Sequence, residues 1–300
     1  MDQYRPTARG KVAFGEWETA YEIFGTLPAP SGEVPLIGLH GGPGIPGRYL
    51  LPLSSLVESH GIPLILYDQI GCGNSTHLRE KGGDFWTVEL FLKELENLLE
   101  KLGIKEYDLL GHSWGAMLAA EHALLHPPGL RKIVLSDGLA SMKMWEDNAN
   151  ALVKTLPQDA QDAIEKYERL GDYDAPEYKA ATEVFYNTFV CRMKPWPVEL
   201  LESFRLFEQD TTVYLIMLGA SEFSIFGTLK SWDIVSRLSE ITAPTLVINS
   251  KYDEASDVVV QPFADAIKGS KWVKFEESAH MPMLEEREKY VKVVGEWLAE

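Results

Sequence analysis

Cysteine is scarce in this chain of 300 residues, and long apolar runs are missing. Two cysteines, Cys72 and Cys191, are present, too few for the disulfide framework that holds small secreted domains together. No uninterrupted apolar stretch reaches the roughly 20 residues that a membrane-spanning helix needs. The first residues, from Met1 to Pro6, show no apolar signal segment. We therefore expect a cytoplasmic protein with no membrane partner.

Positive charge is also in short supply. Lys and Arg number 28 against 45 Asp and Glu, which gives a formal net charge of −17 at pH 7. Nucleic acids and anionic membranes attract basic surfaces, so neither is expected as a partner. The acidic balance slightly favours cationic or amine-bearing ligands, although solubility alone explains it equally well. Hydrophobic residues make up 45% of the chain, which is enough for one large α/β domain or a core with an insertion.

A Gly-x-Ser-x-Gly motif, Gly111 to Gly115, lies where a predicted strand meets a predicted helix. The strand is the apolar stretch 107–110, and the helix is 116–124. A strand that turns sharply into a helix through this motif is the nucleophile elbow of α/β-hydrolases. Glycine is needed there because a Cβ would collide with neighbouring backbone in so tight a turn. Ser113 is therefore predicted to be the nucleophile, with its hydroxyl at a helix N-terminus.

Strands and helices alternate over most of the chain. Before residue 138 the predicted strands are 11–14, 19–24, 36–39, 63–67, 107–110 and 132–136. Apolar spacing predicts a helix from Val88 to Leu102. After residue 243 the predicted elements are a strand at 244–249, a helix at 259–267, a strand at 271–275 and a helix at 286–298. This alternation predicts an α/β-hydrolase fold, whose mostly parallel central sheet carries helices on both faces.

The alternation is interrupted from Leu139 to Thr242, where the pattern is helical and no strand is predicted. We expect a helical cap domain at 139–242, inserted into a core domain formed by 1–138 and 243–300. Some of its aromatic side chains are expected to form the core of the cap, and others to line a substrate pocket. These residues are Trp145, Tyr167, Tyr173, Tyr178, Phe185, Tyr186, Phe189, Trp196, Phe204, Phe207, Tyr214, Phe223 and Phe226.

A serine hydroxyl needs a general base, and the base needs a carboxylate that fixes its tautomer. His280 follows the last predicted strand, where a side chain reaches the carboxyl edge of the sheet, so we predict that it is the base. Asp253 ends the strand before it and gives the order Ser, Asp, His that this fold uses. Asp137, after an earlier strand, is the runner-up, and Asp257 and Glu254 remain open as alternatives.

The tetrahedral intermediate needs hydrogen-bond donors for its oxyanion, and backbone amides supply them without loss of side-chain entropy. Trp114, directly after the nucleophile, is one expected donor. The other should come from the loop His40-Gly41-Gly42-Pro43-Gly44, in which we choose Gly42. His40 itself is expected to brace this loop. No metal and no organic cofactor is required by this chemistry.

Several motifs together resemble the proline iminopeptidases and their amino-acid amidase relatives. The motifs are His40-Gly41-Gly42-Pro43-Gly44, Asp68-Gln69-x-Gly71-x-Gly73-x-Ser75, Gly111-x-Ser113-Trp114-Gly115, Asp253-Glu254 ahead of His280, and Glu222-Phe223-x-Ile225-x-Gly227-x-Leu229-x-x-Trp232-Asp233. The resemblance runs from the first strands to the last helix. It implies an enzyme that acts on a small peptide, amino-acid amide or arylamide with a free N-terminal amine. It also implies that Glu222 and Glu254 hold this amine.

The chain departs from the family pattern at three positions. Ile70 and Asn74 stand where larger bacterial members often carry arginine, and Ser250 stands where glycine is common. A preference for proline therefore stays open beside a broader aminopeptidase or amidase activity. An esterase, lactonase or biosynthetic acyl hydrolase on the same triad is the alternative function. A non-catalytic binding protein is disfavoured by the intact triad, and an aspartate-nucleophile enzyme is disfavoured by serine at position 113.

Overall fold

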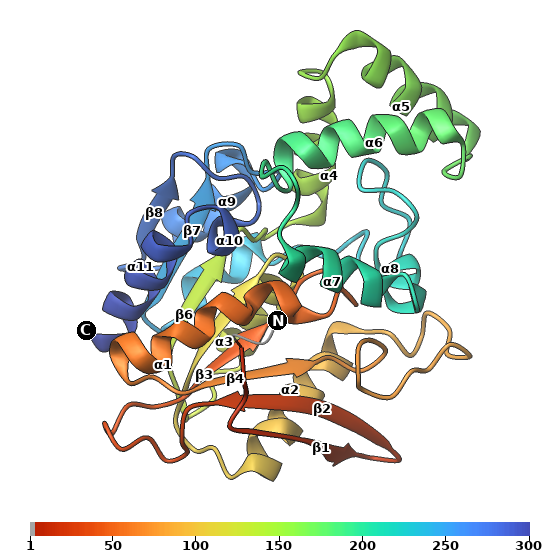
Figure 1. Cartoon of the computed structure of the whole chain (residues 1–300). Helices are drawn as coiled ribbons and strands as arrows, with labels where there is room; N and C mark the ends of the chain where they lie inside the picture. Colours follow the sequence, from red (N-terminus) through yellow and green to blue (C-terminus); the bar gives the residue numbers. More distant parts are fainter. Residues whose placement is uncertain (1–3) are drawn as a thin grey trace.

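The computed structural model describes residues 4–300, and in this part of the chain eight strands form one sheet (Figure 1). The strands lie in the order β1-β2-β4-β3-β5-β6-β7-β8. Pairing is antiparallel from β1 to β2 and from β2 to β4, and parallel between all later neighbours. The strands are β1 (Ala8–Phe14), β2 (Trp17–Phe24), β3 (Leu36–Leu39), β4 (Leu64–Asp68), β5 (Tyr107–His112), β6 (Leu130–Ser136), β7 (Thr245–Ser250) and β8 (Lys271–Phe275). The predicted mostly parallel sheet is thus confirmed.

Helices cover both faces of the sheet because successive strand residues point to opposite sides. Leu109 and Ile133 pack into one apolar layer, with α2, α3 and α9. Leu110 and Val134 pack into the other layer, with η1, α1 and α11. These elements are η1 (Gly47–Ser54), α1 (Ser55–His60), α2 (Val88–Leu102), α3 (Trp114–Leu124), α9 (Asp257–Ala266), α10 (Pro282–Glu285) and α11 (Arg287–Ala299).

The helix α2 shows why a boundary can be read from sequence. The Thr87 side chain accepts a hydrogen bond from the Leu90 amide and caps the N-terminus. Gly103 ends the helix in a left-handed conformation, with φ of 68°, that favours glycine. Between them the apolar residues recur on one face, and the predicted helix from Val88 to Leu102 is confirmed without change.

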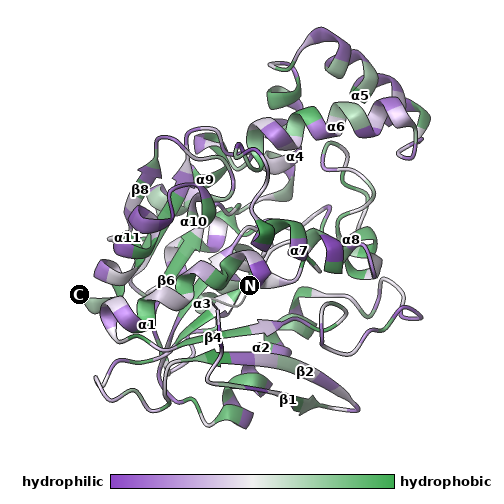
Figure 2. Ribbon diagram, in the orientation of Figure 1, coloured by the Kyte–Doolittle hydropathy of each residue, from purple (hydrophilic) through white to green (hydrophobic). Residues whose placement is uncertain are grey.

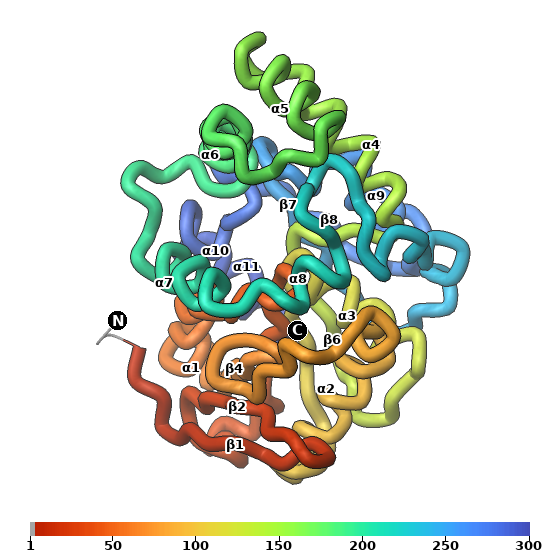
Figure 3. The backbone as a smooth tube through the Cα atoms, turned by 90° about the vertical axis from the view of Figure 1, so that its right-hand side faces the viewer, coloured from red at the N-terminus to blue at the C-terminus, as the bar shows by residue number. Residues whose placement is uncertain are grey.

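Five helices lie between β6 and β7 in the chain. They are α4 (Met142–Val153), α5 (Gln158–Leu170), α6 (Pro176–Phe189), α7 (Val198–Phe207) and α8 (Thr212–Met217), and η2 (Val235–Glu240) leads back to the sheet. The helices α4, α5 and α6 share a small apolar core that includes Ala149, Ile164 and Phe185. Figures 1 and 3 both place α5 and α6 at the end of the molecule farthest from β1 and β2. In Figure 2 these two helices carry hydrophilic and hydrophobic patches along their length, as helices with one packed face should.

Two features differ from the sequence-based expectation. Residues 47–60, for which no element was predicted, form η1 and α1, because Leu50, Leu53 and Leu56 are fully buried although the short segment shows no clear helical period. A short helix that was not predicted, α10 (Pro282–Glu285), precedes the closing helix, and the predicted helix 286–298 is confirmed as α11. In residues 4–300, no helix combines the length and the apolar character needed to cross a membrane.

Candidate active site

The turn between β5 and α3 holds Ser113 in a strained backbone conformation. Its φ is 56°, in the left-handed region that residues other than glycine rarely adopt. A Cβ on Gly111 would lie 2.0 Å from the carbonyl oxygen of Gly115, and a Cβ on Gly115 would lie 2.1 Å from that of Leu39. Glycine at both positions is therefore a steric requirement. The turn places Ser113 at the N-terminus of α3, on the wall of a cavity of about 580 Å³.

His280 lies in the loop between β8 and α10, and its ring also lines the cavity. Its Nδ1 is 2.7 Å from Asp253 Oδ1, and both side chains are buried. Asp253 Oδ1 also accepts a hydrogen bond from the Ala255 amide. The structure thus brings Asp253 and His280 together. Within residues 4–300, no hydrogen bond joins the Ser113 hydroxyl to the His280 ring. Catalytic hydrogen bonds are often long or poorly aligned in a free enzyme, and they shorten when substrate binds.

The electrostatic surroundings of His280 are acidic. Burial works to lower the pKa of the ring, but the negative charges of Asp253 and Glu254 outweigh it and raise the pKa to about 9. Glu254 Oε1 lies 3.6 Å from Nε2, the ring nitrogen that is not bonded to Asp253. These acidic surroundings favour the protonated form of the ring when no ligand is bound.

The loop 40–44 approaches the elbow, and its backbone amides have different partners. The Gly41 amide donates to the Tyr49 hydroxyl at 2.6 Å. Gly42 has a φ of 112°, which suits glycine. In the described part of the chain, the amides of Gly42 and Trp114 have no acceptor, and both residues line the cavity beside Ser113. The two N–H groups chosen from sequence thus remain available to a ligand.

Gln69 ties this loop to the elbow. Its side-chain amide donates to the His40 carbonyl at 3.1 Å, and its side-chain oxygen accepts from Trp114 Nε1 at 2.8 Å. The Gln69 backbone N–H donates to His40 Nε2. His40 is therefore a neutral ring whose pKa is lowered by burial, and it braces the loop as expected.

The two predicted amine-binding residues line the same cavity as Ser113. Glu222 lies in the segment after α8, and its Oε1 accepts a hydrogen bond from the Tyr214 hydroxyl. Glu254 follows β7 and is buried, with its Oε2 unpartnered by any described residue. Burial raises the pKa of both carboxyl groups. The cavity therefore offers carboxyl oxygens with unused acceptor capacity next to His280, and a cation bound beside them would favour their charged form.

Most of the aromatic residues of 139–242 lie in a core or on the cavity wall, and Phe226 lies in neither. Phe185 is fully buried in the small core, and Phe226 is 63% exposed. The cavity is lined by Trp145, Tyr173, Tyr178, Tyr186, Phe204, Phe207, Tyr214 and Phe223. The walls are mostly apolar, so the carboxylates lie in surroundings of low polarity that strengthen their interaction with a cation.

The alternative acids lie elsewhere. Asp257 pairs with Lys274 and Asn249 and does not contact His280. Asp137 lies close to Asp253 and His280, but the ring bonds to Asp253 and not to Asp137. Two supporting residues were not predicted as part of the site. Tyr49 comes from η1, which no pattern indicated, and its hydroxyl lies 3.0 Å from His112 Nδ1. The other is His112, whose ring bonds to Tyr49 and not to the nucleophile, and whose Nε2 donates to the His280 carbonyl at 2.7 Å.

Comparisons with known proteins cover nearly the whole chain. A family model described as alpha/beta hydrolase fold matches residues 34–287. A proline iminopeptidase of Heyndrickxia coagulans is 39% identical over 267 residues, which are 89% of this chain and 91% of that protein. The crystal structure of VinJ is 43% identical, with a TM-score of 0.95 over 98% of this chain and 99% of that chain. The crystal structure of a proline iminopeptidase from Mycobacterium smegmatis is 38% identical, with a TM-score of 0.92 over 97% and 98%.

A sheet of this order, with a serine held in a strained turn between strand and helix, defines a hydrolytic enzyme of α/β-hydrolase architecture. The chain belongs to the alpha/beta hydrolase fold family and, within it, to the proline iminopeptidase branch. The resemblance drawn from the motifs is thereby confirmed.

Proposed function

We propose that this chain is a serine hydrolase that releases an N-terminal amino acid, proline or another small or hydrophobic residue, from peptides, amides or arylamides. The observation that carries the proposal is the pair of carboxylates, Glu222 and Glu254, in the cavity that Ser113 and His280 line. A protonated amine held there gains charge-assisted hydrogen bonds. Holding the amine also places the neighbouring carbonyl within reach of Ser113. The names of the relatives, proline iminopeptidases, support the same reaction.

In the proposed mechanism, neutral His280 takes the proton of the Ser113 hydroxyl, and the oxygen attacks the substrate carbonyl. The amides of Gly42 and Trp114 stabilise the oxyanion. Asp253 holds the Nδ1 proton and stabilises the imidazolium. His280 then gives its proton to the leaving amine, and an aminoacyl ester forms on Ser113. A water molecule, activated by the same ring, releases the amino acid.

The bound amine also helps to prepare the base. Asp253 and Glu254 raise the pKa of His280 to about 9, which favours the protonated ring in the free enzyme. A substrate ammonium that pairs with Glu254 places a positive charge beside His280 Nε2 and neutralises the effect of the Glu254 carboxylate. The ammonium also repels a protonated ring, so the pKa of His280 falls and the neutral ring becomes populated. Substrates without an ammonium would not cause this change.

The structure also supports an arrangement in two parts. We infer that residues 1–138 and 243–300 form the core domain and residues 139–242 the cap domain, because the second part has an apolar core of its own.

Both cysteines are buried free thiols, which suits a reducing cytoplasm. We propose small free-amine substrates as the partners and no nucleic acid, because the formal net charge is −17.

A pair of substrates tests the amine grip. An aminoacyl-arylamide and its N-acetylated twin share the scissile bond, but the twin carries no ammonium. We expect kcat/KM for the free amine to exceed that for the twin by about 10- to 100-fold, since a hydrogen bond to a charged group contributes about 1.5–3 kcal/mol. Glu254→Gln should remove most of this preference. Glu202→Gln, at a half-buried carboxylate of α7 that pairs with Arg205 outside the cavity lining, is the matched control and should leave it unchanged.

Equal rates on the two substrates would contradict the proposal. An esterase, lactonase or biosynthetic acyl hydrolase on the same triad would show that result, together with faster turnover of simple esters than of free-amine amides. Loss of activity in Ser113→Ala by at least about 10⁴-fold is expected in either case. The substrate pair therefore separates the two functions, and the serine variant tests the mechanism that they share.

A further inference from the structure

A second buried aspartate lies directly behind the proposed triad. Asp137 follows β6, is fully buried, and has a φ of 52°, so its backbone is held in the left-handed region. Asp and Asn tolerate this region better than other side chains with a Cβ. Its Oδ2 accepts a hydrogen bond from Ser136 Oγ at 2.5 Å, and Ser136 accepts one from the Tyr290 hydroxyl at 2.8 Å. The carboxyl group is thus held in one orientation.

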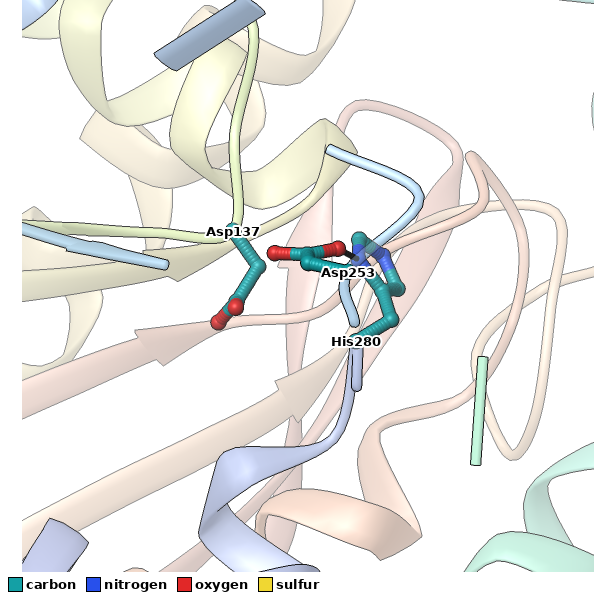
Figure 4. Close-up of side chains that lie close together, drawn as sticks. All are labelled: Asp137, Asp253 and His280. Atoms are coloured by element: carbon teal, nitrogen blue, oxygen red, sulfur yellow. Dashed lines mark hydrogen bonds and ion pairs between the residues drawn. The ribbon is translucent and has the colours of Figure 1, made fainter. Parts of the chain in front are cut away.

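The carboxyl groups of Asp137 and Asp253 face each other. Asp137 Oδ1 and Asp253 Oδ2 are both buried, and neither has another hydrogen-bond partner in the described residues. A carboxylate oxygen of Asp137 lies within 4.8 Å of one of Asp253. In Figure 4, one oxygen of Asp253 lies by the His280 ring and the other lies on the side of Asp137. Two carboxylate oxygens that face each other in this way need a proton between them.

Asp137 and Asp253 cannot both be ionised. Two negative charges within 4.8 Å of each other in a buried site repel strongly, so one of the two carboxyl groups keeps its proton. Asp253 accepts hydrogen bonds from His280 and from the Ala255 amide, which favour its charged form. Asp137 accepts one hydrogen bond, from a neutral hydroxyl. A single proton on Asp137 Oδ1 gives both unpartnered oxygens a hydrogen bond at once.

We propose that Asp137 is neutral and donates a hydrogen bond to Asp253 Oδ2, so that it positions the triad carboxylate. This inference rests on the proposed role of Ser113, Asp253 and His280. The donated bond fixes the plane of the Asp253 carboxylate toward His280. It also spreads part of the carboxylate charge onto Asp137, which makes Asp253 a weaker base and keeps the shared proton on His280. Asp137 is a positioning residue, because it touches neither substrate nor the reacting atoms.

The surroundings of Asp137 support a neutral group. Burial and the charge of Asp253 raise the pKa of Asp137 well above its usual range. His112, whose Nε2 lies 3.9 Å from Oδ2, is kept neutral because burial lowers its pKa. The other titratable groups that act on Asp137 from packed elements are Tyr49 of η1, Glu285 of α10 and Tyr290 of α11. No lysine or arginine in residues 4–300 forms an ion pair with Asp137.

The test compares substitutions that separate the hydrogen bond from the charge. Asp137→Asn keeps the shape, tolerates the left-handed backbone and donates through its Nδ2. Asp137→Gly relieves the backbone and removes the donor. Asp257→Asn is the matched control, since Asp257 follows the same strand as Asp253 but pairs with Lys274 outside the site. A fluorophosphonate serves as the substrate-independent reagent for the serine, and its inactivation rate is measured against pH for each protein.

We expect Asp137→Asn to react within about threefold of the parent, with the pH midpoint of the rate unchanged to within about 0.3. Asp137→Gly should react about 10- to 100-fold more slowly, with a midpoint at higher pH, because an unsupported Asp253 is more basic and raises the pKa of His280. A purely structural role would lower the rate without moving the midpoint. A midpoint in Asp137→Asn that falls by one unit or more would show that Asp137 is ionised, and would overturn the inference.

Infrared difference spectra of the parent and Asp137→Asn provide an independent readout. The parent should show the band of a protonated carboxyl group that the variant lacks, and absence of this difference would overturn the inference. Failure of the parent to react with the fluorophosphonate would refute the proposed serine chemistry, and the infrared difference would still decide the protonation of Asp137.

Asp137, Asp253 and His280 also have donor atoms within 4.8 Å of one another. Loss of reactivity on chelation, with recovery on adding zinc, would place a cation there instead of the proton.

Discussion

At the residue scale, the chemistry depends on the protonation of one ring. His280 lies among Asp253, Glu254 and Glu222, whose charges outweigh the effect of burial and raise its pKa to about 9. The base that the mechanism requires is the neutral form. The carboxylates proposed to bind the substrate amine therefore also favour the protonated ring in the free enzyme, and in the proposed mechanism a bound ammonium relieves that effect.

This coupling predicts two different pH midpoints. In the free enzyme, phosphonylation by a neutral fluorophosphonate should rise with pH and level off above about 9. For a free-amine arylamide, the midpoint in kcat, which reports the bound complex, should lie at lower pH. Glu254→Gln should lower the free-enzyme midpoint, since Glu254 contributes to the raised pKa of His280. Coincident midpoints in the free enzyme and the complex would exclude the effect of the substrate ammonium.

At the scale of single elements, the elbow between β5 and α3 is the most constrained part of the chain. Gly111 and Gly115 meet backbone atoms where a Cβ would stand, and backbone cannot move aside as a flexible side chain can. The strain of Ser113 is therefore maintained by two close backbone contacts and by the hydrogen bond from its amide to the Ser136 carbonyl.

Substitution of these glycines tests that constraint. We expect Gly111→Ala to reduce the free energy of unfolding by about 3 kcal/mol or more, because its Cβ would lie 2.0 Å from a carbonyl oxygen. Gly82→Ala is the control. Its Cβ meets no atom within 4 Å, so the change should stay within about 0.5 kcal/mol. Urea denaturation of both variants measures the difference, and similar stabilities would refute the steric account.

A second element-scale contact joins the segment between α7 and α8 to the loop after β4. Asp210 is buried, and its Oδ2 lies 2.6 Å from His77 Nδ1 and 3.1 Å from Arg79 Nε. Burial opposes its charge, but hydrogen bonds from Thr212 and His77 prevail and hold the pKa of Asp210 below its usual value. A lowered carboxyl pKa stabilises the fold above the usual value of about 4, and the stabilisation is lost as the pH falls through the lowered pKa.

Asp210→Asn should therefore reduce the free energy of unfolding by about 1–3 kcal/mol at pH 7, and by less as the pH falls below about 4. Amide hydrogen exchange should speed up in α7 and α8 at pH 7. Glu202→Gln breaks an exposed pair with Arg205 on α7 and should change stability by no more than about 0.5 kcal/mol. An equal loss in both variants would show that the Asp210 contacts contribute nothing specific.

At the scale of the whole molecule, the cavity lies where loops from the sheet meet the helices α4 to α8. The carbonyl of Phe189, at the end of α6, accepts hydrogen bonds from the amides of Glu254 and His280. One carbonyl thus fixes both loops that carry the acidic and basic groups. Glu222 comes from the segment after α8, so the proposed amine-binding pair draws on parts of the chain that are far apart in sequence.

Sequence patterns predicted the parts of this arrangement that depend on local structure. The bounds of α2 follow from Thr87, Gly103 and the apolar period between them. The elbow follows from glycine spacing between a strand and a helix. The first and last strands were located, though β1 is longer than expected. These features are set by nearest neighbours along the chain, which is why they can be read from sequence alone.

Features that depend on distant partners could not be predicted in this way. The segment 47–60 is helical because its leucines are buried against β3, β4 and α11, and not because of its own periodicity. Tyr49 joins the site through His112, 63 residues away. Asp137 lies near Asp253 because β6 and β7, which the two residues follow, pair in parallel. The sequence alone does not show this pairing, so it indicated Asp137 as an alternative triad acid and not as a neighbour of Asp253.

Trapping the covalent intermediate tests the central claim most directly. Rapid acid quenching of the enzyme during turnover of an aminoacyl-arylamide, followed by peptide mass spectrometry, should find the aminoacyl group as an ester on Ser113. The same experiment with Ser113→Ala should give no adduct and no turnover. An adduct on another residue, or turnover in Ser113→Ala close to that of the parent, would contradict the account.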